Sequence, residues 1–569
     1  MTAPPAPLLA ADAESAAVGR VRLVERLLGD PEDPGNDCGY RAVLASPGAG
    51  GETPAPLGRA LRTAGLGGHF VPAALGGSLG RLDTLARTLR PVFRRDVSAG
   101  LELGAGPFRG ALPVWCAGSA DRRRRTADLL LDGGGIALRQ GARSVREAFA
   151  PAGLRARRTA YGFELDGECA GLRAAPGTSA LLLHATVGPG PGGGPTVLLA
   201  DLAALPRDRL TVRPDGRVEF TACPLPAGSA VGEPGGGAEL FLRTLQICGS
   251  VVASMSLGAA DTCLRQAAAR ALVPRGRRRE PSPKEASALL GGAFLDLLAC
   301  DCLALVGTRA VGVVPDETSV LSAAVRCVVP VLLGDALRDL AALMGPQSLR
   351  EDGPDPLFAR HARTLGAVAS PGAGSFIGRA AVLPQLPRLA RQAWFNGPPA
   401  PDTLFDPAGD LPPFAPERVT LRAERDGLSA LLGGPRDPFG RTGAEPGSPP
   451  AGLRALFRAE LRSVQAHFAA VPEDHRGLPG DPRSLALADR YLLVLTAAAC
   501  LGCYEAVRSR GGFWADPAWI TGILRRLARR LDLPVDDASP AETGRVHDEV
   551  MRRFLTRRGF DLYETPLEG

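Results

Sequence analysis

The order of hydrophobic and polar positions divides the chain into helical regions and one strand-rich region. From residue 1 to about 135, apolar residues recur at helical spacing, most clearly over 13–28, 79–90 and 121–131. From about 136 to 235 the period shortens toward two, and Gly and Pro bound the short apolar runs. Long runs at helical spacing then return. The pattern predicts a β-domain inserted between helical regions.

The strand-rich region predicts short strands joined by turns. Asp215 and Gly216 separate the last two of these strands, and Asp-Gly is a strong hairpin signal. The predicted strands are 154–159, 162–165, 180–185, 196–200, 210–214 and 218–223.

Residues 236–394 predict long helices with broad apolar stripes, at 240–273, 284–311 and 320–344. Such stripes fit helices that are buried on more than one side in a bundle. Pro330 predicts a kink in the third helix.

A stretch rich in Pro and Gly follows over 395–450, and it predicts a connection that runs over the surface. The remaining predicted helices are 452–471, 483–508, 517–533 and 540–558. We therefore expect an N-terminal helical domain over 1–135, a β-domain over 136–235, a helical bundle over 236–394, a linker over 395–450 and an additional helical domain over 451–569.

Composition excludes some classes of partner. The chain has 569 residues, of which 45% are hydrophobic and 22% charged, as is typical of globular proteins with several cores. The formal net charge of +6 is small for this length, and few aromatic residues accompany the arginine clusters at 122–125, 275–279 and 525–530. This disfavours nucleic-acid binding.

The eleven cysteines show no disulfide-like framework, and the first residues do not resemble a signal peptide. We expect reduced thiols in the cytoplasm. Cys500 and Cys503 have redox spacing but lie in an apolar helix, which favours two buried core thiols. No run of about 18 apolar residues is present, so no membrane span is expected. No metal-ligand spacing is present, so no metal site is expected.

One stretch, 218–269, combines a strand, a turn, a glycine-rich lead-in and a long helix. The strand begins at Val218, Pro226 opens the turn, the lead-in ends at Gly237, and helical spacing begins at Leu240. This order resembles the junction between the β-domain and the C-terminal bundle of acyl-CoA dehydrogenases, and the resemblance spans roughly residues 50–390. It implies a mostly α fold with a central β-domain: an N-terminal helical domain, a β-barrel-like domain and a C-terminal four-helix bundle. The region after 450 resembles the extra helical domain of the longer family members.

The resemblance also implies chemistry. Family members are homotetramers or dimers that hold FAD between the β-domain and the bundle. They remove the α-proton of an acyl-CoA with a carboxylate and pass hydride from Cβ to flavin N5. For this chain the resemblance implies FAD and an acyl-CoA or acyl-carrier thioester as ligands.

The first flavin motif of the family, L-T-E-P-x-x-G-S-D, is poorly matched. It corresponds to the run from Leu138 to Arg146, in which Arg139 stands for Thr. Deleting one residue would bring Ser144 to the family's Ser. Two interpretations of Arg139 and Arg143 are open. In one they attract a diphosphate, because a guanidinium group suits phosphate. In the other they face solvent.

Two further flavin motifs are also only partly present. In the motif N-G-x-K-x-W-I-T-N, Asp166 and Gly167 match a hairpin turn, but Gly171 stands for Trp and Arg173 for Thr. The motif R-x-x-F-G keeps Arg275 and lacks Phe-Gly. The cofactor contacts that the resemblance implies are Leu138, Arg139, Ser144, Arg173 and Arg275.

The carboxylate base of the family is missing. The Glu of its Y-E-G-T loop corresponds to Ala369 or, counted from the other side, to Ala373. No Asp or Glu occurs between Asp355 and Asp402. The alternative base position, on the first bundle helix, corresponds to Gly249.

Three other residues come into question as a base. His361 titrates near neutral pH when unperturbed, but a structural or surface histidine is favoured. Cys248 lies in an apolar helix, which raises the pKa of a thiol. Glu239 points to the site or to solvent, and solvent is favoured.

Three functions follow as hypotheses. The first is an FAD-dependent oxidoreductase that acts on the CH-CH group of an acyl thioester with a rebuilt site. The second is a catalytically inactive homologue that serves as a scaffold or as the partner subunit of an active one, in a homo- or hetero-oligomer. The third is a thioester-binding enzyme that no longer needs flavin.

Overall fold

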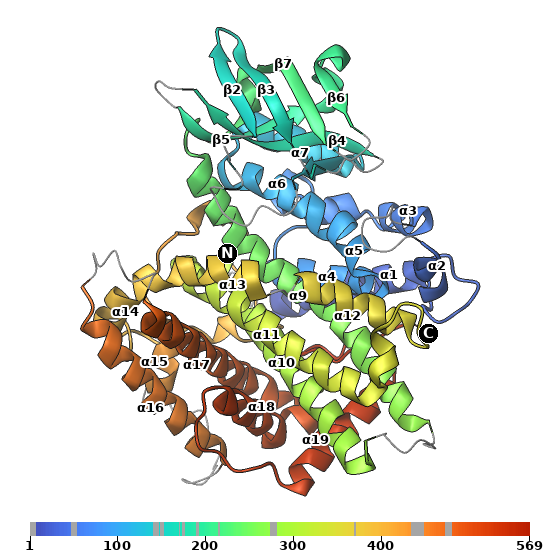
Figure 1. Ribbon diagram of the computed structural model, residues 1–569, viewed down its shortest axis with the longest axis vertical. Helices are drawn as coiled ribbons and strands as arrows, with labels where there is room; N and C mark the ends of the chain where they lie inside the picture. Colours follow the sequence, from blue (N-terminus) through green and yellow to red (C-terminus); the bar gives the residue numbers. More distant parts are fainter. Residues whose placement is uncertain are drawn as a thin grey trace.

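The computed structural model describes residues 7–46, 54–139, 147, 149, 153–169, 171–172, 177–188, 193–213, 217–273, 281–368, 371–433, 449–472 and 481–568. The sheet lies at one end of the molecule, the helical bundle at the other, and the N-terminal helices lie between them and beside the bundle (Figure 1). The predicted order of a helical region, a β-domain and a bundle is confirmed.

The N-terminal helices are α1 (Pro7–Leu28), α2 (Tyr40–Ala45), α3 (Ala55–Thr63), α4 (Leu82–Arg95), α5 (Val97–Ala99), α6 (Gly106–Ala117) and α7 (Ala120–Leu131). The stretches predicted at 13–28, 79–90 and 121–131 fall on α1, α4 and α7. The pattern missed α6 because its twelve residues include two glycines, two prolines and a single charged residue, Arg109. Glycine and proline are poor helix formers, and a single charged residue does not mark a polar face.

All the predicted strands are present in one eight-stranded sheet with the order β6-β7-β3-β2-β4-β5-β8, in which β1 also pairs with β4. The strands are β1 (Gly135–Leu138), β2 (Leu154–Thr159), β3 (Gly162–Cys169), β4 (Thr178–Val187), β5 (Gly194–Asp201), β6 (Leu210–Val212), β7 (Val218–Pro226) and β8 (Ala230–Val231). β1 and β8 were missed because they are too short to show a period of two. The β6–β7 pairing confirms the predicted hairpin, whose Asp215 and Gly216 lie outside the described residues.

Alternate residues of β4 belong to two different hydrophobic cores. Ala180 and Leu182 pack in the large core that includes the helices, whereas Leu181 and Leu183 pack in a smaller core within the sheet. A strand covered on both faces reads as a continuous apolar run, as this one does. The double burial attaches the sheet to the helices.

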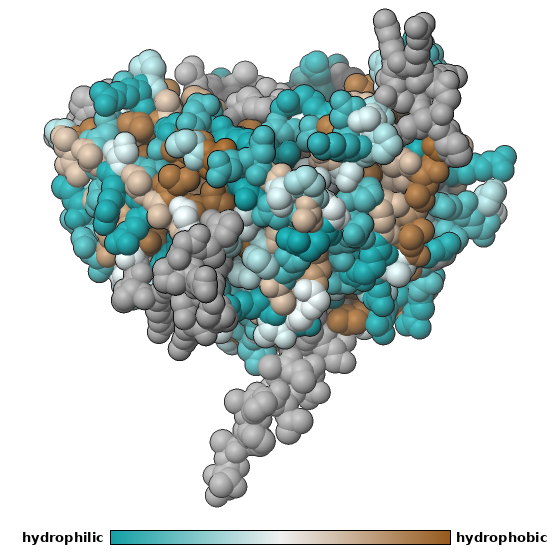
Figure 2. Space-filling model, turned by 90° about the horizontal axis from the view of Figure 1, so that it is seen from below, coloured by the Kyte–Doolittle hydropathy of each residue, from teal (hydrophilic) through white to brown (hydrophobic). Residues whose placement is uncertain are grey.

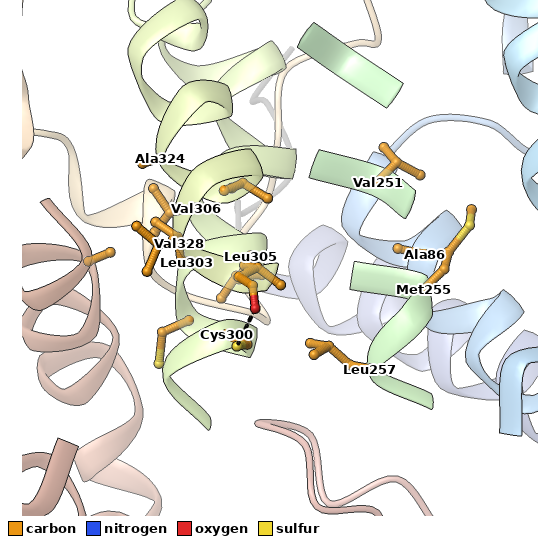
Figure 3. Close-up of a cluster of buried hydrophobic side chains, with 14 of the residues drawn as sticks. Ala86, Val251, Met255, Leu257, Cys300, Leu303, Leu305, Val306, Ala324 and Val328 are labelled. Carbon is orange, nitrogen blue, oxygen red and sulfur yellow. Dashed lines mark hydrogen bonds between the residues drawn. The ribbon is translucent and has the colours of Figure 1, made fainter. Parts of the chain in front are cut away.

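The bundle consists of α9 (Gly237–Leu272), α10 (Pro283–Val313), α11 (Thr318–Met344), α12 (Pro356–Val368), α13 (Pro371–Val382) and α14 (Leu386–Gln392). A capping box formed by Ser282 and Glu285 begins α10. Val251 of α9, Val306 of α10 and Val328 of α11 belong to the core between these helices (Figure 3). Pro330 lies inside α11, and the kink stays a prediction.

The Pro- and Gly-rich stretch does not lie wholly on the surface, and this part of the expectation was wrong. Leu404, Phe405 and Leu428 are buried. The ring of Phe405 fills the space beside Gly502, where a Cβ would lie 2.4 Å from Cδ1 of the phenylalanine. Arg309 of α10 donates to the carbonyl of Thr403 at 2.8 Å and so holds the stretch against the bundle.

The C-terminal helices are α15 (Gly427–Gly433), α16 (Pro449–Ala469), α17 (Pro482–Val507), α18 (Pro517–Arg530) and α19 (Pro540–Leu555). Cys500 and Cys503 are buried in α17, as predicted. After α19 the chain returns to the bundle through a buried ion-pair cluster, which we call the tail network: Arg90, Arg94, Asp261, Asp301 and Asp561.

In the part of the chain that the structure describes, four helices are long and apolar enough to cross a membrane by length and composition alone: α9, α10, α11 and the stretch Pro482–Arg510. The expectation that the chain has no membrane span is therefore not confirmed. It depended on uninterrupted apolar runs, and isolated polar residues such as Asp296 and Asp301 interrupt helices that are otherwise apolar. Between 67% and 94% of their most apolar windows is buried inside the protein. On the face seen in Figure 2, hydrophobic residues form separate patches among hydrophilic ones.

Candidate functional site

The region where the sheet meets the helices is the candidate site, and we call it the junction. It is defined by Arg109 on α6, Arg139 after β1, His184 on β4, Cys248 on α9 and Arg326 on α11. Four of these residues come from four different elements, and Arg139 directly follows a fifth. The resemblance in sequence places a cofactor between the same two parts of the fold.

Glycines allow the elements of the junction to approach closely. A Cβ on Gly110 of α6 would lie 2.7 Å from the Ile136 side chain of β1. A Cβ on Gly237, the first residue of α9, would lie 2.7 Å from the carbonyl oxygen of Pro195 on β5. Both separations are shorter than carbon atoms tolerate without a shift. These glycines therefore set how near the sheet comes to α6 and α9.

Three rings fill part of the junction. The Phe149 and His184 rings lie edge to face with centroids 5.1 Å apart, and Phe241 of α9 lies 5.5 Å from His184 in the same manner. Burial, together with the charges of Arg139 and Arg109, lowers the pKa of His184 to about 4. The imidazole is therefore neutral at pH 7. Its Nδ1 is buried and has no hydrogen-bond partner among the described residues.

Positive charge surrounds Cys248. Burial raises the pKa of this thiol to about 12, against the opposing effect of Arg109 and Arg326. Burial also lowers the pKa of Arg326 to about 10, and Arg109 adds to the shift. Arg326 donates from Nη1 to the carbonyl of Leu245 at 3.2 Å. A thiol with so high a pKa is protonated and cannot act as a base, as the sequence indicated.

The alternative base position has no room for a carboxylate. A Cβ on Gly249 would lie 2.9 Å from Cδ of Arg326, so the arginine stem occupies that space. Of the two residues at the usual base position, Ala369 lies outside the described residues. Ala373 lies in α13, but its side chain also lies outside what the structure describes.

The other proposed bases lie elsewhere, as the favoured interpretations expected. His361 of α12 is 1% exposed, and burial lowers its pKa to about 4. It follows Arg360, which pairs with Asp96 at 2.7 Å. The Glu239 side chain is 63% exposed and pairs with Arg243 at 2.7 Å. His361 is therefore structural, and Glu239 faces solvent.

Only two of the five residues that the resemblance implies as cofactor contacts lie among the described residues. Leu138 is buried at the end of β1, and Arg139 donates from Nη1 to the carbonyl of Glu147 at 2.9 Å. Ser144, Arg173 and Arg275 lie outside the described residues.

The predicted hairpin turn at Asp166 and Gly167 is wrong. Both residues lie within β3, where the register shifts between Leu165 and Gly167 and the φ of Gly167 is 113°. Asp166 accepts a hydrogen bond from the backbone of Ala222 at 2.7 Å, so the pair forms a bulge that pins β3 to β7.

Sequence reasoning missed Arg109, Phe149, His184, Phe241 and Arg326. A signal existed for one of them: Arg326 is the sole charged residue between Thr318 and Gly334 of an otherwise apolar helix. The others come together only through tertiary packing. Among the described residues, no group of three or more His, Cys, Asp or Glu is placed to hold a metal ion.

Two cavities lie away from the junction. One, of about 10 Å³, is lined by the tail network and has room for a single water. The other, of about 490 Å³, is an open groove near Arg510, Trp514 and Tyr563 in the C-terminal region.

Comparison with known proteins identifies the architecture. No protein-family model and no curated protein matches the sequence. An acyl-CoA dehydrogenase from Bacillus anthracis complexed with FAD matches the structure with a TM-score of 0.68 and 12% identity over 95% of both chains.

Two other matches cover less of this chain. A glutaryl-coenzyme A dehydrogenase matches with a TM-score of 0.52 and 16% identity over 67% of this chain and 97% of its own. Butyryl-CoA dehydrogenase from Megasphaera elsdenii matches with a TM-score of 0.52 and 14% identity, over 67% and 100%. At these identities the likeness shows the fold alone, and the match over 95% includes the C-terminal helices.

Proposed function

We propose that this chain, which has an acyl-CoA dehydrogenase-like fold, is a non-catalytic subunit or scaffold that pairs with an active homologue. The observation that carries the proposal is that no carboxylate base stands at either of the family's base positions. The usual positions are alanines, and the stem of Arg326 occupies the space beside Gly249. Removal of an α-proton needs a base within hydrogen-bond reach, and none is available at either position.

The described residues do not fit an isoalloxazine ring. Gly171, which stands at the position of the family's tryptophan, has no side chain to cover a flavin. Phe149, His184 and Phe241 pack edge to face on one another. We therefore assign no step to FAD in this chain.

A flavin-dependent oxidoreductase with a rebuilt site is the second candidate. Arg109, Arg139 and Arg326 place positive charge at the junction, and guanidinium groups suit a diphosphate such as that of FAD. An acyl-CoA or acyl-carrier thioester would then be the substrate. The cytoplasm is the proposed compartment for either candidate, supported by eleven cysteines that are all free and buried.

The experiment uses the purified full-length protein, incubated with FAD and passed through gel filtration. We expect no flavin absorbance to remain with the protein. If FAD stays bound and bleaches anaerobically on addition of acyl-CoA thioesters of increasing chain length, the proposal is wrong and the second candidate is correct.

A second experiment tests the pairing. The chain is co-expressed with an acyl-CoA dehydrogenase homologue from the same genome whose loop reads Y-E-G-T, with an affinity tag on the homologue alone. We expect the two chains to co-purify at a defined ratio. A homologue that elutes alone would contradict the role of partner subunit.

A further inference from the structure

Two buried carboxyl groups meet where the Pro- and Gly-rich stretch packs against the start of α11, and we call them the carboxyl pair. Glu317, the residue before α11, is 6% exposed, and Asp426 in the stretch is 4% exposed. Oε2 of Glu317 accepts a hydrogen bond from the backbone nitrogen of Gly427 at 2.8 Å. That nitrogen belongs to the peptide bond that follows Asp426. The two acidic residues, far apart in the sequence, therefore meet around a single peptide group.

The groups that bind Asp426 are neutral. Tyr491 of α17 donates from its hydroxyl to Oδ2 at 2.6 Å, and the backbone of Ser429 donates to Oδ1 at 3.0 Å. Burial raises the pKa of Tyr491 well above its ordinary value, so the phenol keeps its proton. The nearby Arg425 pairs with Asp316 at 2.8 Å, and its side chain is 59% exposed. Neither member of the carboxyl pair forms an ion pair with a described residue.

Two negative charges in this place are unfavourable, because burial disfavours each charged form and the second charge adds repulsion. Burial raises the pKa of Glu317 to about 7, against the hydrogen bond from Gly427. The charges of Asp426 and Asp316 raise it as well, and that of Arg425 lowers it. Glu317 therefore holds a proton on the acid side of neutrality and loses it on the alkaline side.

The segment that carries Asp426 depends on its contacts for its position. Residues 419–426 form neither helix nor strand. The backbone of Thr420 donates to the carbonyl of Pro315 at 3.3 Å, and that of Ala423 donates to Oε1 of Gln385 at 2.6 Å. A segment of this kind can open locally while the helices around it stay folded.

We propose that the carboxyl pair is a pH-sensitive switch, in which a proton on Glu317 keeps the segment 419–427 closed against α11 and α17 and loss of that proton opens it. The pKa of Glu317 is raised above its ordinary 4.5, so the contribution of this residue to closing is full below pH 4.5 and is lost as pH rises through 7. The contact between the bundle and α15 then depends on pH. The inference does not rest on the proposed function.

The test measures hydrogen–deuterium exchange of the full-length protein by mass spectrometry from about pH 6 to 8.5, with rates corrected for the intrinsic effect of pH on amide exchange. We expect the opening constant of the amides in 419–429 to rise about tenfold, because Glu317 regains its ordinary pKa on opening. Peptides from α10 are the internal reference and should not change. Glu317→Gln keeps an oxygen that accepts from Gly427 and should remove the rise. Glu424→Gln, the same change at a side chain that is 68% exposed, should keep it.

Each other outcome would contradict the switch. The proposal is wrong if the corrected rates in 419–429 stay constant across the pH range, or if the rise persists in Glu317→Gln. A rise of equal size in the peptides from α10 would show global opening and would also overturn it. Asp426→Asn provides a reading if Glu317→Gln does not fold. Removing the neighbouring charge lowers the pKa of Glu317, so the rise should become smaller, and an unchanged rise would count against the switch.

Discussion

Helix α9 contacts two groups of arginines. Aspartates neutralise the charge of one group, and no described carboxylate pairs with the other. In the tail network, Arg90 and Arg94 of α4 pair with aspartates from α9, α10 and the C-terminal tail. At the junction, Arg109 and Arg326 lie near the same helix and have no carboxylate partner among the described residues. The arginines of the tail network are fully buried, whereas Arg109 and Arg326 are half-buried, so the two groups also differ in how much water reaches them.

The difference shows which of the two groups has a structural role. In the tail network, Asp301 also accepts from the backbone of Leu562 and Asp261 accepts from the backbone of Phe560, so the aspartates hold the tail as well as the arginines. Removing one partner would leave a buried charge unpaired. The junction arginines form no ion pair with a described residue, and Arg326 contacts α9 through its hydrogen bond to the carbonyl of Leu245.

The largest expected effect comes from Asp301→Leu in the tail network. This substitution leaves Arg90 without its closest carboxylate and should lower the free energy of unfolding by about 3–5 kcal/mol. Urea unfolding followed by circular dichroism and tryptophan fluorescence would measure the loss. The double variant Arg90→Met with Asp301→Leu should recover much of it, and a loss below about 1 kcal/mol in the single variant would contradict a structural role.

Acid pH should affect the two regions in different windows. The pKa of His184 is lowered to about 4 from its ordinary 6.5, so its contribution to stability is full above pH 6.5 and is lost as pH falls through 4. The pKa of Asp561 is lowered from 3.8 to about 2, despite its burial, by Arg90 and Arg94, so its contribution is lost only between these two values.

His184→Phe should therefore reduce the loss of stability between pH 6.5 and 4 by about 1–3 kcal/mol and leave the lower window unchanged. His69 and His361, whose pKa values are also lowered to about 4, keep part of the slope in the upper window. Melting temperatures across the pH range would measure both windows, with Asp561→Asn as the matched variant for the lower one. An unchanged slope in His184→Phe would contradict a buried neutral imidazole.

A smaller effect is expected from Arg326→Leu. Removing a half-buried charge that has no ion pair should leave the free energy of unfolding unchanged or raise it by about 1 kcal/mol. The same urea unfolding would test this against Asp301→Leu. If Arg326→Leu lowered the free energy of unfolding as much as Asp301→Leu does, the junction arginine would be structural, and the two groups of arginines would not differ in role.

The smallest effect is expected at the surface. Arg157 and Glu164 lie opposite one another on β2 and β3 with a 2.7 Å ion pair, and the arginine side chain is 69% exposed. Arg157→Ala should change the free energy of unfolding by less than about 1 kcal/mol. A larger change in the urea midpoint would mean that exposure does not predict the value of an ion pair in this protein.

Prediction from the sequence succeeded where periodicity carries the information. β2 was predicted at its observed bounds, and α9, α10 and α11 were predicted to within a few residues. It failed at α6, which contains two glycines, two prolines and one charged residue. It also failed in the Pro- and Gly-rich stretch, where Phe405 packs into the core against Gly502. A periodic pattern needs polar residues at regular intervals, and packing between distant segments leaves no local signal.

The sequence by itself determined the order of helical and strand-rich regions, the absence of a carboxylate at the expected base positions, and the lack of acids near Arg139 and Arg326. These properties depend on residue identity and local spacing, which can be read directly from the sequence. The tertiary structure alone decided that Arg109 and Arg326 lie near Cys248 while Arg90 and Arg94 pair with three aspartates. Electrostatic interaction depends on distance through space, and residues more than 200 positions apart become neighbours only when the chain is folded.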